Sequence, residues 1–558
     1  MRSEWRTIGH WLAVCPILLA AFACHGARGD DFDVVSGRCA ARVGRVRPEA
    51  AARVLVTMRE DGTWADVDYA DANPSRWKTA CHLSERVLPL AEHYRDTHDV
   101  RFADAAVRAL HAWVRMRLVN PNWWWNAVGA PLPFADAALC LAPGLSKADR
   151  EAFADYLEVC QLNPRASGAN ALWFSKIVMR RALLRRDGGL MREAVASVAA
   201  ELAVVADDRE GGIKRDWSYH QHGRMVQFGN YGCAFIRELP DVLESLEGTR
   251  WGIPRENLEN VRRLLSDGFR WVVFDGRLDI TSCGRQIFKG CQEQKGRAIQ
   301  KAFERYRKMG MDVPVEAPVG FRDFFLSGYC IYRGKGWMGS VRMSNQKIDG
   351  VETTCNSENM RGGHVADGSL FLHVTGEEYR DIFPLWGNWR LIPGVTTYLD
   401  LPPVRTSRRC NLDNLLVTHA DGSSASVVFG LDREGLRAEK RWEFSPSGVV
   451  CRGSGITATN CHSRVVTCVE NCLAGEDARI GEYREGRLTA FNSGKRYVIA
   501  ARQESIHAEI AEHEGDWKDV LGNNPSETHR GKLFTIWIDH GVEPTGARYS
   551  YSVRMVNP

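Results

Sequence analysis

A histidine and a tyrosine lie nine positions apart in a glycine-rich segment, and both side chains can transfer protons. The segment reads DWSYHQHGRMVQFGNYG and contains His222 and Tyr231. On one continuous α-helix of about 100° per residue, the two side chains would face opposite sides. Gly223, Gly229 and Gly232 argue against such a helix, because glycine adopts backbone angles that other residues avoid. We therefore predict a loop carrying His222 that turns near Gly229 into a helix starting near Tyr231, which brings both side chains to one pocket.

Aromatic and polar groups elsewhere in the chain could serve the same pocket. Tryptophans 123 to 125 cluster at a predicted helix break, where exposed rings could stack on sugars, although burial in a core is the more common use of tryptophan. An amide, two cations and a polar pair complete the candidates: Asn170, Arg285, Lys289, Glu358 and Asn359.

Two kinds of segment must position these residues. From about residue 77 to residue 265, apolar side chains recur at helical spacing, as in Leu83, Val87 and Leu90. After about residue 315, short alternating runs separated by Gly, Asn, Asp and Pro are typical of antiparallel strands. A chain of 558 residues is too long for one ordinary core. Helices followed by strands predict two segregated domains, a helical one over 24–315 and an antiparallel β domain over 316–558.

Charge and motif content argue against several functional classes. The net charge of +4 arises from 73 basic and 69 acidic residues, so no general nucleic-acid surface is expected. The glycine spacing of Gly334, Gly336 and Gly339 leads into a strand-like run and lacks the helix that would bind a dinucleotide. His220 with His222 has no evident further ligand, so we predict no metal site. We expect no required cofactor, with a structural cation as the open alternative.

The N-terminus reads as a signal peptide over residues 1–23. Arg2 and Arg6 precede an apolar run that is too short to span a bilayer, which requires about 20 residues. We expect export to the periplasm or the extracellular space, no integral membrane segment after signal removal, and a monomer. Lipid attachment at Cys24 is the alternative to release. Sixteen cysteines in an exported chain could supply disulfides, and their pairing cannot be deduced from spacing.

Taken in order, the motifs resemble polysaccharide lyase family 8, which includes the hyaluronate, chondroitin AC and xanthan lyases. The likeness extends from about Asp61 to Thr397. It rests on the Asn-Trp-Trp at 122–124, the Gly-Ala-Asn at 168–170, the Gln-His-Gly at 221–223, the Tyr-Gly at 231–232, the Gly-Arg at 284–285, the Asn-Ser-Glu-Asn at 356–359 and the WGNWRLIPG that begins at Trp386. The resemblance implies an incomplete α/α toroid followed by an antiparallel β-sandwich, and an anionic uronic-acid polysaccharide, such as hyaluronan or chondroitin, as substrate.

The resemblance also implies β-elimination at C4 of a uronic acid, which leaves a 4,5-unsaturated sugar. The C5 proton is weakly acidic, so the site must neutralise the neighbouring carboxylate, remove the proton and protonate the leaving oxygen. Asn170 would bind the carboxyl group. Tyr231 would take the C5 proton and return one to the leaving oxygen, with Arg285 stabilising its phenolate. Alternatively, His222 is the base and Tyr231 only the acid.

The remaining residues take supporting roles under the same resemblance. Glu358 and Asn359 would orient Arg285 and Tyr231 from the β domain, and Asn359 would also bind the substrate. Sugar rings would stack on Trp123, Trp124 and Trp386. Lys289 would contact the substrate where many members of the family have a second arginine.

Three alternatives follow from the residues themselves. A glycoside hydrolase on the same toroid would need two carboxylates, for which Asp207, Asp208 and Asp216 are available outside the motif set. A non-catalytic carbohydrate-binding protein would keep only the tryptophan groove. Asn170 could also cap a helix that begins at Ala171 and have no catalytic role.

Overall fold

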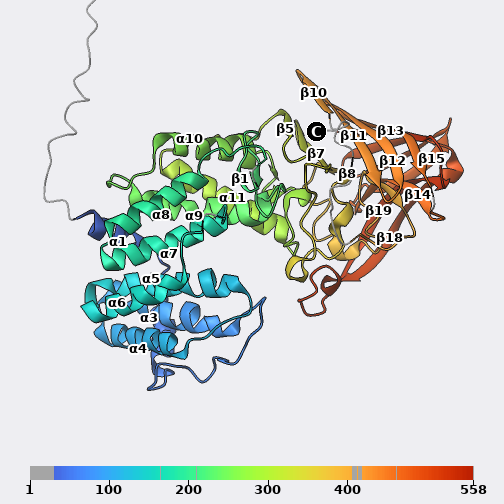
Figure 1. Ribbon diagram of the computed structural model, residues 1–558. Helices are drawn as coiled ribbons and strands as arrows, with labels where there is room; N and C mark the ends of the chain where they lie inside the picture. The colour runs from blue at the N-terminus through green and yellow to red at the C-terminus, as the bar shows by residue number, and fades with distance from the viewer. Residues whose placement is uncertain are drawn as a thin grey trace, which may run out of the picture.

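The chain folds into a helical region and a β region that lie side by side (Figure 1). The computed structural model describes residues 30–163, 165–208, 210–404, 411, 417–459 and 461–556. The predicted signal peptide over 1–23 and the predicted lipidation site at Cys24 lie outside the described residues.

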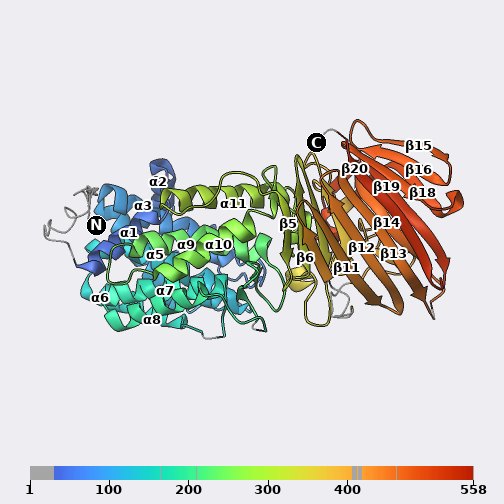
Figure 2. The same ribbon diagram turned by 90° about the horizontal axis from the view of Figure 1, so that it is seen from above.

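The helical region is an array of packed α-helices. They are α1 (Asp31–Arg42), α2 (Pro48–Val56), α3 (Leu88–Thr97), α4 (Val100–Met116), α5 (Pro131–Leu141), α6 (Lys147–Tyr156), α7 (Ala169–Arg185), α8 (Gly188–Glu201), α9 (Cys233–Leu246), α10 (Arg255–Arg263) and α11 (Cys291–Lys308). In α4, the Asp99 side chain caps the first turn, and Phe102, Leu110 and Trp113 are buried on one face. Helix α11 runs along the array toward the β region (Figure 2).

Helices α5 and α7 pack inside the array. The stretch Trp125–Gly144, which includes α5, is long and apolar enough to cross a membrane, but 61% of its apolar window is buried inside the molecule. Helix α7 is buried on most of its surface, and two of its buried cations are paired: Lys176 with Glu238, and Arg180 with Asp136. These helices therefore form the core of the array, and the start of α7 carries Asn170.

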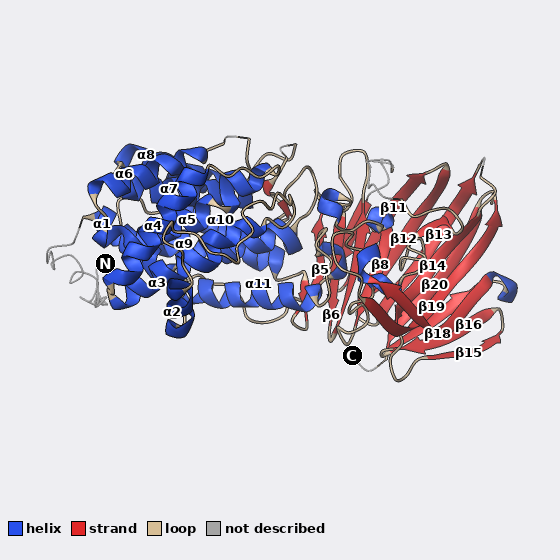
Figure 3. Cartoon of the chain, turned by 90° about the horizontal axis from the view of Figure 1, so that it is seen from below, coloured by secondary structure: helices blue, strands red, loops and turns tan. Residues whose placement is uncertain are grey.

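In the described part of the β region, the strands form three antiparallel sheets, which Figure 3 shows in red, apart from the helices. The first contains, in order, β5 (Gly320–Phe324), β6 (Tyr329–Gly334), β7 (Trp337–Met343) and β8 (Asp367–His373). The second contains β10 (Val417–Asp421), β11 (Ser424–Arg433), β12 (Leu436–Ser445), β13 (Gly448–Ala458), β20 (Ala547–Met555), β17 (Lys495–Ala500), β16 (Arg487–Asn492) and β15 (Arg479–Arg484). The third contains β18 (Ile506–Asp516), β19 (Thr528–Val542), β14 (Arg464–Leu473) and β9 (Thr396–Tyr398).

Alternating burial explains why these segments form strands. In β12, every second residue is buried, including Leu436, Trp442 and Phe444, because successive side chains of a strand point to opposite faces. Gly334 and Trp337 pair in the hairpin between β6 and β7, so the glycine spacing noted above lies in a β-hairpin and opens no helix. The predicted fold class, helices followed by an antiparallel β domain, is confirmed.

A buried aspartate joins the helical region to the first sheet. Asp279 precedes α11, is 1% exposed, and accepts hydrogen bonds from Ser340 at 2.9 Å and Tyr329 at 2.8 Å; it also contacts His373 Nε2 at 3.1 Å. Burial raises the pKa of Asp279. The contact with His373 and the hydroxyl donors lower it by more than burial raises it, so the net pKa lies below the usual value. The carboxylate is ionised at neutral pH and fixes the β region, with the loops after β7, over one end of the helices.

Candidate active site

A cleft of about 850 Å³ lies where helix ends meet loops of the β region. Its helical wall comes from residues 122–133, the start of α7, α9 and the segment from Arg285 into α11. Its β wall comes from residues 355–358 and 521–524. A cleft built from both regions can enclose an extended polymer between them.

Local backbone geometry brings His222 and Tyr231 to this cleft. After the short strand β2 (Tyr219–His220), His222 has a left-handed φ of 60°. The π-helical turn η6 (Phe228–Gly232) then presents Tyr231 ahead of α9. A Cβ at Gly229 would lie 2.4 Å from the Ser282 carbonyl oxygen, so only glycine permits this close approach. The two rings pack with centroids 4.5 Å apart.

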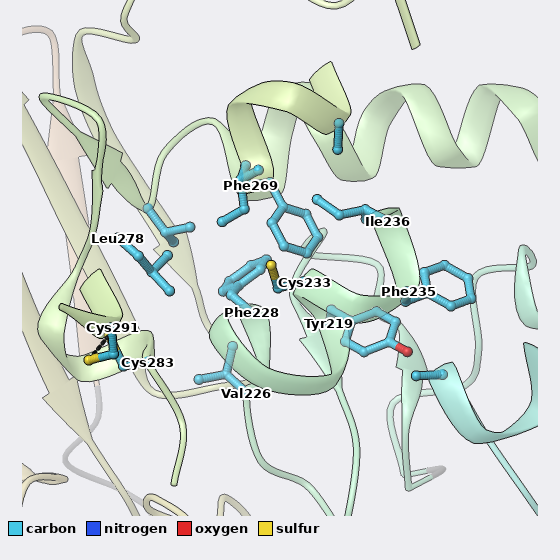
Figure 4. Packing of buried hydrophobic residues seen from close by; sticks show 14 of the residues in the cluster. Tyr219, Val226, Phe228, Cys233, Phe235, Ile236, Phe269, Leu278, Cys283 and Cys291 are labelled. Atoms are coloured by element: carbon cyan, nitrogen blue, oxygen red, sulfur yellow. Dashed lines mark hydrogen bonds between the residues drawn. The ribbon is translucent and has the colours of Figure 1, made fainter. Parts of the chain in front are cut away.

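Buried aromatic residues hold the turn in place. Figure 4 shows Phe228 beside Phe269, and Tyr219 beside Phe235, which belongs to the first turn of α9. The ring centroids of Phe228 and Phe269 are 4.9 Å apart, and both side chains are fully buried. This packing fixes the position from which Tyr231 enters the cleft.

A carboxylate that the motif analysis missed connects the histidine to the arginine. Glu352 Oε1 lies 2.8 Å from His222 Nδ1. Its Oε2 accepts hydrogen bonds from Arg285 Nη1 at 2.8 Å and from Gln227 Nε2 at 2.9 Å. Arg285 in turn donates from Nη2 to the Tyr231 hydroxyl at 3.2 Å. Glu352 therefore positions both partners of the tyrosine.

The charges in this network are set by burial and by mutual contact. Burial raises the pKa of Glu352, but its hydrogen bond with His222 and the charge of Arg285 lower it more, to about 2. Burial disfavours the charged form of Arg285, yet Glu352 and Tyr231 keep its pKa above the usual value. Burial raises the pKa of Tyr231, and Arg285 opposes that rise. At neutral pH the resting site therefore holds an ionised Glu352, a charged Arg285 and a neutral phenol.

Glu358 and Asn359 lie in a strained loop between β7 and β8. Glu358 Oε2 accepts from Arg285 Nε at 2.6 Å and lines the cleft. Burial raises the Glu358 pKa, whereas Arg285 lowers it. Asn359 is buried behind this wall, outside the lining of the cleft, and donates to the Glu352 carbonyl oxygen at 2.9 Å. The prediction that it binds the substrate is therefore wrong, because its side chain is held inside the loop. Thr354, Asn356, Ser357 and Asn359 all have positive φ, a strained backbone state that clusters at functional sites.

Asn170 faces the cleft from the first turn of α7. The helix begins at Ala169, and its N-cap is Gly168 with a φ of 62°. The Ala169 amide donates to Gln221 Oε1 at 3.2 Å, so the side chain of Gln221 caps the N-terminus of the helix. The Asn170 Oδ1 atom is buried without a hydrogen-bond partner. The capping alternative for Asn170 is therefore wrong, and its amide is available to a ligand.

Four tryptophans form one side of the cleft. Trp123 is 55% exposed, and Trp124 and Trp125 are half-buried with centroids 5.1 Å apart. Trp173, which lies three residues after Asn170 on the same face of α7, contacts Trp124 at 5.8 Å. The helical spacing from Asn170 could have identified Trp173 from the sequence.

Besides Asn359, two other predicted substrate-binding residues lie outside the cleft lining. Trp386 is 1% exposed and packs against Trp389 in the core of the β region, so the prediction that it stacks on a sugar is wrong. Lys289 lies outside the lining of the cleft and pairs with Glu527 at 2.6 Å on the surface. Its position does not fit the predicted substrate contact.

A cation and a carboxylate on α9 also line the cleft. Arg237 is 60% exposed, and Glu238 accepts from Trp173 Nε1 at 2.8 Å and from Lys176 at 3.0 Å. Arg237 Nη2 lies 3.5 Å from Glu238 Oε1, which is a long distance for an ion pair. Sequence reasoning missed both residues, although Glu238 follows Tyr231 at two-turn helical spacing.

The carboxylates expected for a hydrolase do not converge here. Asp207 pairs with Arg215 on the surface, and Asp216 is buried, accepting from the Leu326 amide at 2.7 Å. Neither residue lines the cleft. Within the described ranges, no group of three or more His, Cys, Asp or Glu residues could hold a metal ion.

Comparisons with known proteins support one family over nearly the whole chain. The profile for the "Polysaccharide lyase family 8, N terminal alpha-helical domain" matches residues 40–310, and that for the "super-sandwich domain" of the same family matches residues 319–555. Chondroitinase-AC of Pedobacter heparinus is 24% identical over 539 residues, which span 90% of this chain and 76% of the relative. Hyaluronate lyase of Thermasporomyces composti is 24% identical over 545 residues, 82% of this chain and 68% of the relative.

Solved structures show the same fold. A chondroitinase AC lyase solved in oligosaccharide complexes superposes with a TM-score of 0.83 at 22% identity, over 95% of this chain and 83% of the other. The chondroitin AC lyase of Streptomyces coelicolor A3 in complex with chondroitin sulphate gives 0.80 at 20% identity, over the same shares.

Proposed function

Because the chain belongs to polysaccharide lyase family 8 and is thus a carbon–oxygen lyase, we propose that it cleaves a uronic-acid-containing glycosaminoglycan, such as hyaluronan or chondroitin, by β-elimination. The observation that carries this proposal is the contact of Tyr231 with both His222 and Arg285, in a tryptophan-lined cleft that also presents the amide of Asn170. These are the groups needed to move a proton beside a carboxylate.

The amide of Asn170 neutralises the uronate. When the C5 proton leaves, negative charge spreads onto the carboxyl group, and a fixed hydrogen-bond donor stabilises that charge. Asn170 suits this role because its side chain lines the cleft and its Oδ1 is not held by any protein group in the described structure, so the amide can turn toward a ligand. Its NH₂ group would donate to the carboxylate, beside the rings of Trp124 and Trp173.

Tyr231 transfers the proton with the help of His222. The ionised Glu352 can only accept, so His222 Nδ1 carries the hydrogen and Nε2 keeps a lone pair. Nε2 accepts the phenolic proton, and the hydrogen bond from Arg285 stabilises the phenolate. The phenolate takes the C5 proton and delivers it to the leaving oxygen at C4, after which His222 returns its proton to Tyr231.

Cations on the cleft wall bind the anionic groups of the polymer. Arg237 is the exposed cation on the tryptophan side, where a sugar stacked on Trp124 would carry its acidic groups. Arg76 also lines the cleft, where it donates to Asn524 Oδ1 of the β wall at 3.3 Å. We propose that these arginines take the role that the sequence assigned to Lys289. The reaction needs no cofactor, because the proton acceptor, the donor and the charge-neutralising groups are all side chains.

One assay separates this proposal from its rivals. The protein is incubated with hyaluronan, chondroitin and xanthan while ultraviolet absorbance of the unsaturated product and new reducing ends are both measured. Lyase activity produces the two signals together. Reducing ends without absorbance would indicate a hydrolase, and binding without either signal would indicate a non-catalytic carbohydrate-binding protein.

A further inference from the structure

Two buried cysteines stand at the ends of the segment that carries Arg285. Cys283 follows the turn η8 (Ile280–Ser282), and Cys291 is the first residue of α11. Their sulfur atoms are 4.0 Å apart in an S–H···S hydrogen bond, drawn as a dashed line in Figure 4. Both side chains are buried, at 0% and 2% exposure. Among the cysteines in the described part of the chain, no other two thiols are hydrogen bonded to each other.

The segment between them forms part of the active-site wall. Arg285, Gln286 and Phe288 all line the cleft. Gly284 and Gly290, each next to one of the cysteines, both have a φ of 72°. Glycine restricts the backbone least, so these two positions are the natural hinges of the segment. A covalent bond between the residues just outside the hinges would close the loop that Arg285 occupies.

We propose that Cys283 and Cys291 form a disulfide that closes the Arg285 loop. A disulfide needs its sulfurs about 2.05 Å apart, so the thiols must approach by about 2 Å, a distance within reach of side-chain rotation. Lys295, one turn along α11, donates to the Cys283 carbonyl oxygen at 2.6 Å and to the Gln286 carbonyl oxygen at 2.7 Å. It already holds the two sides of the loop together.

The local electrostatics favour thiolate chemistry at one of the two sulfurs. The contact with Cys283 lowers the pKa of the Cys291 thiol, and the nearby Lys295 acts in the same direction. The same contact, together with burial, raises the pKa of Cys283. Cys291 is therefore the nucleophile of the pair.

The oxidant is a small disulfide of the glutathione class, or a protein disulfide that exchanges in the same way. The Cys291 thiolate attacks one sulfur of the oxidant, forming a mixed disulfide and releasing one thiolate. The Cys283 thiolate then attacks the Cys291 sulfur, and the second oxidant thiolate leaves. The protein loses two electrons and two protons, and the oxidant gains both as two free thiols. The exchange takes place during folding, once Cys283, Cys291 and Lys295 have come together and before burial excludes the oxidant.

Peptide mapping tests the bond directly. The full chain is unfolded and reduced, refolded with oxidised and reduced glutathione, alkylated, and digested with trypsin without reduction. Trypsin cuts after Arg285 and Lys289, so the disulfide joins two separate peptides, 278–285 and 290–295. We expect this linked pair, and its loss when dithiothreitol is added to the digest. Recovery of both peptides alkylated and unlinked, or linked instead to Cys233 or another cysteine, would overturn the proposal.

Stability supplies an independent readout. The oxidised wild type should unfold at a higher temperature than the reduced wild type, on the order of 5 °C, because the bond restricts the unfolded chain. The double variant C283S/C291S should show no such dependence on the oxidant, and C233S, which lacks a buried thiol outside the pair, should retain it. An equal response of the wild type and the double variant would contradict the assignment. Neither cysteine touches the substrate cleft, so the readout does not depend on the proposed lyase activity.

Discussion

Replacing Glu352 by glutamine should disable the active site while leaving the shape of the side chain unchanged. Both carboxylate oxygens of Glu352 face hydrogen-bond donors: Oε1 faces His222 Nδ1, and Oε2 faces Arg285 Nη1 and Gln227 Nε2. Glutamine has one oxygen and one NH₂ group, so in either orientation a donor meets a donor. His222 or Arg285 must then move or change its hydrogen bonding.

The size of the effect follows from the titration of Glu352. Its pKa lies at about 2 instead of 4.5, and each pKa unit corresponds to about 1.4 kcal/mol, so the ionised form gains about 3 kcal/mol from the site. Its side chain is only 9% exposed, so solvent screens little of this energy. Because the folded pKa is depressed, the stabilisation is fully present above pH 4.5 and is lost as pH falls through about 2. Losing it at neutral pH should lower the free energy of unfolding by about 3 kcal/mol. The accompanying displacement of His222 or Arg285 should lower kcat/KM by about 100-fold.

The assay is the rate of unsaturated product formation, measured together with thermal unfolding. Glu244, on α9, provides a matched control. Its carboxylate accepts from two arginines, Arg42 at 2.9 Å and Arg305 at 2.7 Å, but it lies outside the cleft lining. E244Q should destabilise the helical region and keep its kcat/KM. If E352Q retained kcat/KM within a few-fold of E244Q, the role assigned to Glu352 would be refuted.

Three further predictions concern the amide, the cleft cation and the proton relay. N170A should lower kcat/KM by about 10² to 10³ with no change in unfolding temperature, since Asn170 Oδ1 makes no protein hydrogen bond, and unfolding with intact specific activity would contradict this. R237A should raise KM about tenfold and weaken its salt dependence, whereas K289A should leave KM near the wild-type value; the reverse order would show that Lys289 binds the polymer. H222A should be nearly inactive at pH 7 but should gain about tenfold in kcat/KM per pH unit, because the Tyr231 phenol, whose pKa burial raises above 10.0, must then ionise unaided. A flat profile for H222A would instead assign the C5 proton to His222 itself.

Much of the architecture is readable from the sequence, because helices and strands impose different apolar periods. The 3.6-residue period before residue 265 and the alternation after residue 315 predicted a helical domain followed by antiparallel sheets. The glycines around Tyr231 also predicted that a helix would not continue from His222. The structure adds a π-helical turn, Phe228–Gly232, that no local pattern identifies.

The residues that sequence reasoning missed depend on tertiary contacts. Glu352 meets Arg285 across 67 positions and His222 across 130, so no spacing rule could have linked them. Trp386 was predicted to stack on a sugar ring, yet neighbouring side chains such as Trp389 bury it in the core of the β region. Lys289 lies in the same loop as Arg285, but its side chain points away from the cleft and pairs with Glu527. In each case, packing between distant segments decided the role.

The most direct test of the account is the turnover of Tyr231→Phe on hyaluronan and chondroitin. The substitution removes the hydroxyl that contacts Arg285 and leaves the ring beside His222, so the fold and polymer binding should persist. We expect release of unsaturated product to fall to background while binding stays near the wild-type level. A variant that retained most of the wild-type rate would contradict the proposed elimination at this site.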